Sequence, residues 1–211
     1  MKSIHLVIVG FLGAATILAA CGKEPLNHLT PEDTRIYITN FDSSADFSTF
    51  KTYTIADSAA VISNGQSSKE LDAADAAYIA AVDKYMQQRG FIKVPKDQNP
   101  DIGLTVNRIY NTSTGYIDFA DYWDYYGGYW DPYYWGYPGY GYYVPYAYAV
   151  YQVTEGAVSV DMLDLKDATG HNKIDFVWTG LIRGEGILNV ANADSQVQAL
   201  FAQSPYLQPT N

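Results

Sequence analysis

The sequence predicts an α+β fold with two layers: a mostly antiparallel sheet, two helices packed on one face, and a long Tyr/Gly-rich loop. The first observation is a pair of alternating runs, in which every second residue is apolar in 158–162 and again in 174–178. Such alternation indicates strands with one face on a core. The polar segment 166–172 between them contains a glycine and predicts the turn of a hairpin. Phe176 and Trp178 are expected to be buried together on the face that the helices cover.

The second observation is a pair of segments with helical spacing. Apolar residues recur every three or four positions in 71–89, which predicts the first helix. Ser67 and Glu70 resemble its capping box, and Gly90 fits its C-terminal cap. Residues 192–203 predict the second helix, with an asparagine as the expected N-cap.

Further strands are expected where β-branched and aromatic residues cluster or where apolar residues alternate. Together with the hairpin, the expected strands are 35–41, 50–55, 102–110, 153–165 and 174–183. A short extended piece is expected at 91–94. These elements predict a single α+β domain over residues 34–204.

The N-terminus predicts a lipid anchor. After a positive start at Lys2, an apolar run ends in Leu18-Ala19-Ala20-Cys21, and Cys21 is the chain's one cysteine. This pattern resembles the lipobox of bacterial lipoprotein precursors, in which the thiol is acylated and the leader is cut before the cysteine. Residues 1–20 are therefore predicted to be a lipoprotein signal peptide and 21–33 a lipidated tether. The expected location is the cell envelope, where the protein would be an outer-membrane lipoprotein that faces the periplasm or the cell surface. Several acyl chains on the N-terminus would attach it to its expected partner, the membrane.

Composition narrows the classes of partner. The formal net charge is −10, which argues against nucleic acid, because nucleic-acid binding requires a basic surface. Acidic charge also argues against electrostatic adhesion to anionic membrane surfaces.

Residues 116–151 differ from the rest of the chain. They hold 14 of the 20 tyrosines and three of the four tryptophans, no Lys or Arg, and interspersed Gly and Pro. The segment is expected to be a loop inserted between two strands, outside the folding core; the alternative is a low-complexity loop that is partly collapsed on the sheet. Tyr and Trp rings suit stacking on sugars or binding of peptides, so a glycan or an envelope protein is the expected partner. The candidate ligand-binding residues are Tyr125, Tyr126, Tyr129, Trp130, Tyr133, Tyr134, Trp135 and Tyr137.

Several blocks of the sequence resemble a known family. Residues 46–53, 155–164 and 176–180 are similar to the most recognisable blocks of the bacterial lipoprotein domain of unknown function 4136. The resemblance extends over about 34–201. This sequence departs from the family pattern at Thr179, where the family usually has an arginine between Trp and Gly. Because the family has no established activity, the resemblance implies a compartment and a fold and no reaction.

No catalytic residue, cofactor or metal site is predicted. After the leader the chain has only His28 and His171, one in the tether and one in the hairpin turn, and no nucleophile elbow. Asp161 and Asp164 lie three apart on a strand, so their side chains point to opposite faces, and Asp161 is expected to be solvated or paired with a strand neighbour. The acidic residues of the Tyr-rich loop are expected to keep it soluble. The predicted function is that of a non-enzymatic binding or structural lipoprotein; the alternative is an envelope hydrolase with a site that no motif reveals.

Overall fold

The structure is a computed structural model that describes residues 30–63, 66–110, 117–118, 131–146, 149–150 and 156–210. The strands are β1 (Ile36–Phe41), β2 (Thr52–Ile55), β3 (Ala59–Ser63), β4 (Gln66–Glu70), β5 (Ile92–Lys93), β6 (Ile102–Tyr110), β7 (Ile117–Asp118), β8 (Gly141–Tyr143), β9 (Ala149–Val150), β10 (Ala157–Asp164) and β11 (Lys173–Arg183). The α-helices are α2 (Ala73–Gln88), α4 (Ala168–His171) and α5 (Ala193–Ala202), and the 3-10 turns are η2 (Pro31–Thr34), η3 (Phe47–Thr49), η4 (Lys96–Gln98), η5 (Pro132–Trp135) and η6 (Val190–Asn192).

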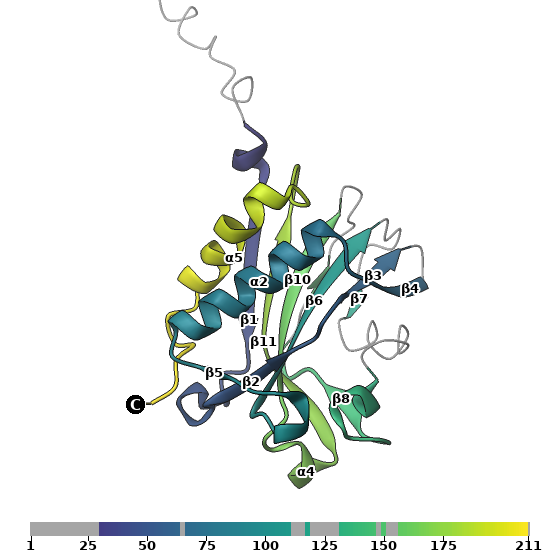
Figure 1. The fold of residues 1–211 in the computed structure, drawn as a ribbon, viewed down its shortest axis with the longest axis vertical. Helices are drawn as coiled ribbons and strands as arrows, with labels where there is room; N and C mark the ends of the chain where they lie inside the picture. Colours follow the sequence, from purple (N-terminus) through teal and green to yellow (C-terminus); the bar gives the residue numbers. More distant parts are fainter. Residues whose placement is uncertain are drawn as a thin grey trace, which may run out of the picture.

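One mixed, open sheet organises the domain, and its main path is β1-β11-β10-β6-β2-β5. The central pairs β1–β11, β11–β10 and β10–β6 are antiparallel, as is the outer pair β3–β4. The pairs β2–β6, β3–β6, β2–β5 and β8–β11 are parallel. Helices α2 and α5 lie side by side across one face, which is here called the first face (Figure 1). The α+β class, the antiparallel centre of the sheet and the two helices on one face are therefore confirmed.

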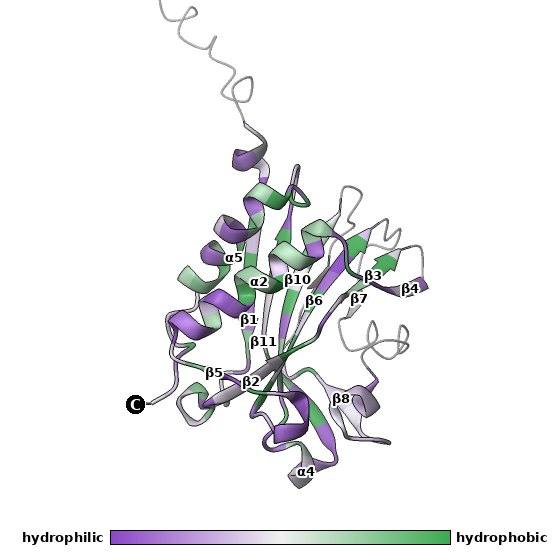
Figure 2. Ribbon diagram, viewed as in Figure 1, coloured by the Kyte–Doolittle hydropathy of each residue, from purple (hydrophilic) through white to green (hydrophobic). Residues whose placement is uncertain are grey.

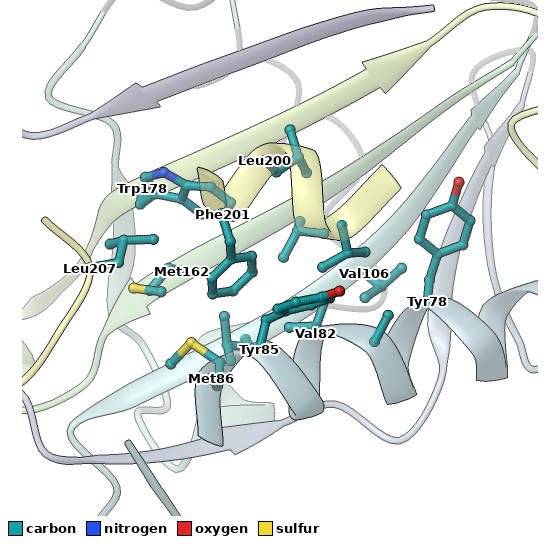
Figure 3. Close-up of a cluster of buried hydrophobic side chains, with 14 of the residues drawn as sticks. Tyr78, Val82, Tyr85, Met86, Val106, Met162, Trp178, Leu200, Phe201 and Leu207 are labelled. Carbon is teal, nitrogen blue, oxygen red and sulfur yellow. The ribbon is translucent and has the colours of Figure 1, made fainter. Parts of the chain in front are cut away.

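The core of the first face lies between the sheet and these two helices. Trp178, Met162 and Val106 point from the sheet toward Phe201 and Val82 on the helices (Figure 3). The Trp178 side chain is fully buried, and its indole N–H donates to Ser204 Oγ at 2.9 Å. The outward side of α5 and of the C-terminal half of α2 is mostly polar, whereas exposed alanines occupy that side in the first half of α2 (Figure 2). Among the described residues, no helix is long and apolar enough to cross a membrane.

A bulge in β11 corrects one prediction. Met162 lies opposite Trp178 but Leu163 lies opposite Phe176, so Val177 is the extra residue. Val177 and Trp178 both pack in the core of the first face, whereas Phe176 packs on the opposite face. The expectation that Phe176 and Trp178 share a face is wrong, because the inserted residue reverses the alternation.

The start of the first helix also differs from the prediction. The capping box is formed by Asp72 and Asp75, whose carboxylates accept hydrogen bonds from the backbone of the first turn and of the N-cap. The residues expected to cap the helix, Ser67 and Glu70, instead lie in β4, which pairs with β3 as a hairpin. Gly90 follows the helix with φ +95°, as predicted for its C-terminal cap.

One smaller expectation is corrected at the other end of the chain. Asn192 precedes α5, but its side chain makes no cap hydrogen bond and donates instead to the Gly186 carbonyl. The expected hairpin is confirmed by the antiparallel pairing of β10 with β11, and the polar segment that connects them contains the short helix α4.

Candidate functional site: the second face of the sheet and its aromatic cover

The second face of the sheet carries a polar row at its centre. Thr105 and Thr179 lie directly across from Asp161 on the two neighbouring strands. Asn107 lies across from Ser159 in the next row. All five side chains are 2% exposed or less, although none is apolar. A buried row of this kind must satisfy its polar atoms internally.

Asp161 is the most constrained member of the polar row. Its Oδ2 accepts hydrogen bonds from Asn107 Nδ2 at 2.7 Å and from Ser159 Oγ at 3.2 Å. No described residue forms a hydrogen bond of normal geometry with its Oδ1. Burial raises the pKa of Asp161 to about 7, although the hydroxyl and amide groups around it act in the opposite direction. Of the two expectations for Asp161, solvation is wrong, because the second face is covered as well as the first, whereas pairing with a neighbour on an adjacent strand is confirmed by the bond from Asn107.

The cover is formed by residues 131–146, here called the aromatic segment. Trp135 is 4% exposed and lies over Gly103, where an added Cβ would come within 3.0 Å of the indole ring. Glycine is therefore needed at that point of β6 for the ring to reach the strand. The hydroxyl groups of Tyr137 and Tyr146 reach the sheet: the first donates to the Leu165 carbonyl at 2.7 Å, and the second lies 2.9 Å from Thr179 Oγ1.

Further aromatic contacts attach the same segment. The Tyr142 ring meets the Phe176 ring edge to face, with centroids 5.6 Å apart. Burial raises the pKa of both Tyr142 and Tyr146. The expectation that residues 116–151 lie wholly outside the folding core is therefore wrong for 131–146, whose inner side chains belong to the core of the second face.

The outer side of the aromatic segment presents rings to solvent. Tyr133 is 72% exposed and Tyr143 is 48% exposed. Lysines lie over two rings of the segment: Lys96 Nζ is 3.9 Å from the centroid of Tyr134, and Lys173 Nζ is 3.7 Å from that of Tyr143. Each geometry is that of a cation–π contact. The surface therefore combines aromatic rings with lysine cations that lie over the faces of two of them.

Elsewhere on the domain is an acidic pocket of about 360 Å³, whose lining includes no residue of the aromatic segment. It lies between the loop after β1 and the two ends of the β10–β11 connection, and its lining includes Asp42, Asp46, Asp164, Asp167 and Asp175. Among the described residues, no group of three or more acidic, His or Cys side chains is arranged to hold a metal ion.

One carboxylate of this pocket is perturbed. Burial raises the pKa of Asp164 to about 6, and repulsion from Asp167 and Asp175 adds to that effect while backbone hydrogen bonds oppose it. His171 lies on the rim of the same pocket.

A second charged cluster has a structural role. The Arg108 guanidinium on β6 contacts Glu70, Asp72 and Asp75 at 2.8, 3.0 and 2.7 Å. Its side chain is 7% exposed. These ion pairs connect the end of β4 and the N-terminus of α2 to the sheet. Loss of the acidic partners would leave the buried Arg108 charge unpaired.

The residues predicted to bind a ligand divide into three groups. Tyr133 is exposed on the outer side of the aromatic segment, Tyr134 and Tyr137 are half-buried, and Trp135 is buried. The other four ligand-binding candidates lie outside the described residues: Tyr125, Tyr126, Tyr129 and Trp130. The predicted lipidation site, Cys21, also lies outside them.

Sequence reasoning missed the polar row and the outward ring of Tyr143. A signal for the row was present, because Ala157 and Leu163 are apolar on the same face of β10 as Asp161. Apolar residues on both faces of a strand indicate a strand covered on both sides.

Comparisons with known proteins agree with this fold. The family model described as "Domain of unknown function (DUF4136)" matches residues 38–206. The chain is similar to a crystal structure of a DUF4136 family protein from Bacteroides thetaiotaomicron VPI-5482, with 28% identity and a TM-score of 0.69 over 83% of this chain and 98% of that chain. A PDZ domain protein from Parabacteroides distasonis ATCC 8503 has 13% identity and a TM-score of 0.38, over 82% of this chain and 36% of that chain, which is too low to carry an argument. No curated protein matches this sequence. Since the family model spans most of the chain, this protein belongs to the DUF4136 family.

Proposed function

We propose that this protein is a non-enzymatic, lipid-anchored binding module of the cell envelope, and that the outer side of the aromatic segment holds a glycan or an envelope protein. The single observation that carries the proposal is the division of the aromatic segment into two sides. Trp135 and its inner neighbours are locked onto the sheet, whereas Tyr133 and Tyr143 face solvent.

Rigid support is what makes exposed rings useful for binding. A tyrosine on a fixed backbone loses few rotamers on contact, so little conformational entropy opposes association. Its flat face suits stacking on a sugar ring, and its hydroxyl suits hydrogen bonding at the edge of a ligand. Lys96 and Lys173 beside the rings add donors for carboxylate or hydroxyl groups of a cell-wall glycan.

The position of the surface in the fold supports the same proposal. Strand β8 lies at the opposite end of the long axis from η2, where the chain enters the domain (Figure 1). A lipid on Cys21 would attach the η2 end to the membrane through residues 21–30, which can span about 35 Å when extended. The rings would then face away from the membrane, toward the space that holds the cell wall and its proteins.

The test is a binding measurement with matched variants. The double variant Tyr133→Ala/Tyr143→Ala should weaken co-sedimentation with isolated cell-wall glycan, or capture of an envelope protein, by at least about tenfold, which is about 1.4 kcal/mol. The control is Ile92→Ala/Val190→Ala, which removes apolar side chains that are 62% and 49% exposed elsewhere on the domain. Both variants should melt like the parent. Equal binding by both variants would contradict the assignment of the ligand to the aromatic segment.

A further inference from the structure

Strand β1 is an edge strand with none of the usual protection against pairing. It ends the main path of the sheet, and among the described residues no strand pairs with its outer side. Its sequence, Ile-Tyr-Ile-Thr-Asn-Phe, contains no charge, proline or glycine. Ile36 and Phe41 at its two ends are each 42% exposed. Natural edge strands usually carry lysine, proline or a bulge, because an unprotected edge pairs with other strands.

The opposite edge of the sheet shows the contrast. Strand β5 has only two residues, one of which is Lys93, and β4 carries Lys69 and Glu70. Shortness and charge protect that side in the expected way. Strand β1 therefore lacks the protection by shortness or charge that β4 and β5 have.

The hydrogen-bond pattern defines which residues of β1 point outward. The Asp42 N–H donates to the Val177 carbonyl of β11 at 2.9 Å. Because backbone groups alternate along an antiparallel strand, Asn40, Ile38 and Ile36 also face β11. The N–H and C=O groups of Tyr37, Thr39 and Phe41 therefore point away from the sheet.

We propose that the outer edge of β1 pairs with β1 of a second copy of this chain, antiparallel and about a two-fold axis at Thr39. In this register each Tyr37 lies opposite Phe41 of the other copy, and Thr39 lies opposite its equivalent. The three outward residues of each strand then exchange about six backbone hydrogen bonds. The pairing also forms two aromatic cross-strand pairs and one Thr–Thr pair, all of which are favourable combinations.

Charge favours a self-pairing partner at this edge. The chain carries a net charge of −10, so most of its surface repels a second copy. The β1 edge is a segment without any charged side chain, where two copies can meet with no like charges opposite each other. A two-fold contact between identical edges is also closed, so it produces a dimer and not a filament.

Cysteine cross-linking tests the register. In the full chain carrying Cys21→Ser and purified in mild detergent, Thr39→Cys should form a covalent dimer under mild oxidation, because directly paired residues lie within disulfide range. Asn40→Cys is the matched control: it lies two positions from its equivalent in this register, about 8 Å away, and should stay monomeric. A mixture of Tyr37→Cys and Phe41→Cys proteins should cross-link with each other and not with themselves. Absence of a Thr39→Cys dimer, or equal cross-linking at positions 39 and 40, would overturn the proposal.

A second measurement addresses association without a cross-link. Analytical ultracentrifugation of the chain with Cys21→Ser should show dimer at micromolar concentration and monomer after Thr39→Pro, which removes the central outward N–H and leaves the bonds to β11 intact. A thermal melt of the Thr39→Pro protein shows whether it is folded. A parent chain that is monomeric up to 100 µM would also overturn the proposal.

Discussion

Replacement of Asp161 by asparagine should remove much of the pH dependence of stability. Asp161 is fully buried and receives two hydrogen bonds on one oxygen, and burial raises its pKa to about 7. The unfolded chain loses this proton near pH 4, whereas the folded chain retains it up to about pH 7. The folded state therefore binds more protons between those values, and its stability falls as the pH rises through that window. Below about pH 4 the group has no effect of this kind.

The magnitude follows from the two pKa values. Linkage gives a cost of about 1.5 kcal/mol at pH 5 and about 4 kcal/mol at pH 8 for a shift of about 3 units. The parent should thus lose about 2–3 kcal/mol between pH 5 and pH 8 relative to Asp161→Asn. Other titrating groups, including Asp164, cancel in this difference because both proteins contain them.

Urea unfolding followed by tryptophan fluorescence provides the assay, at pH 5, 6, 7 and 8. Asparagine keeps the shape of the side chain but carries no titrating proton, so the gap between the two proteins should change with pH and level off above pH 7. Parallel stability curves over the whole range would refute the reasoning and would mean that Asp161 is not an uncompensated buried carboxyl.

Three further predictions concern the core and the anchor. Trp178→Ala should lower the free energy of unfolding by about 3–5 kcal/mol, as for other buried aromatic truncations, and a loss near zero in a denaturant melt would mean that the first face is assigned incorrectly. Gly180→Ala should cost about 1–3 kcal/mol, because an added Cβ would lie 2.6 Å from Trp178 and 2.7 Å from Leu200, whereas Gly170→Ala, with nothing within 4 Å of its Cβ, should be within about 0.5 kcal/mol of the parent. Cys21→Ser should leave the precursor uncut and abolish labelling by a clickable palmitate analogue, and unchanged labelling would contradict the lipid anchor.

The elements predicted best are those whose apolar pattern results from packing against the core of the first face. The helix α2 and the strands β6, β10 and β11 each lie within a few residues of their predicted bounds. The helix α2 and the strands β6 and β10 present a regular apolar face to the core of the first face, and β11 is apolar on both faces. The side of Phe176 could not be predicted, since one bulged residue in β11 reverses the alternation and leaves no mark in composition.

The hairpin β3–β4 was missed for a related reason. Strand β4 is largely exposed and reads Gln-Ser-Ser-Lys-Glu, so its residues lack the alternation that identifies a strand. It is held by pairing with β3 alone among the strands. Serine is also a typical N-cap residue. Sequence reasoning therefore assigns Ser67 to the capping box of α2, although it lies in β4.

The candidate site could be predicted only in part. Aromatic density singled out Tyr133 and its neighbours correctly as an unusual segment, but composition does not distinguish a ring that packs on the sheet from one that faces solvent. That distinction depends on tertiary contacts, such as the close approach of Trp135 to Gly103. The polar row was hidden by the same segment, because its burial depends on a cover that has no periodicity.

The central claim is that the aromatic segment is fixed to the second face of the sheet and is therefore a preorganised surface. The most direct test is a urea unfolding curve for Trp135→Ala. This variant should lose about 3–5 kcal/mol, because Trp135 is 4% exposed and lies against Gly103 in the core of the second face. A loss near zero would contradict it, since the segment would then contribute nothing to the core.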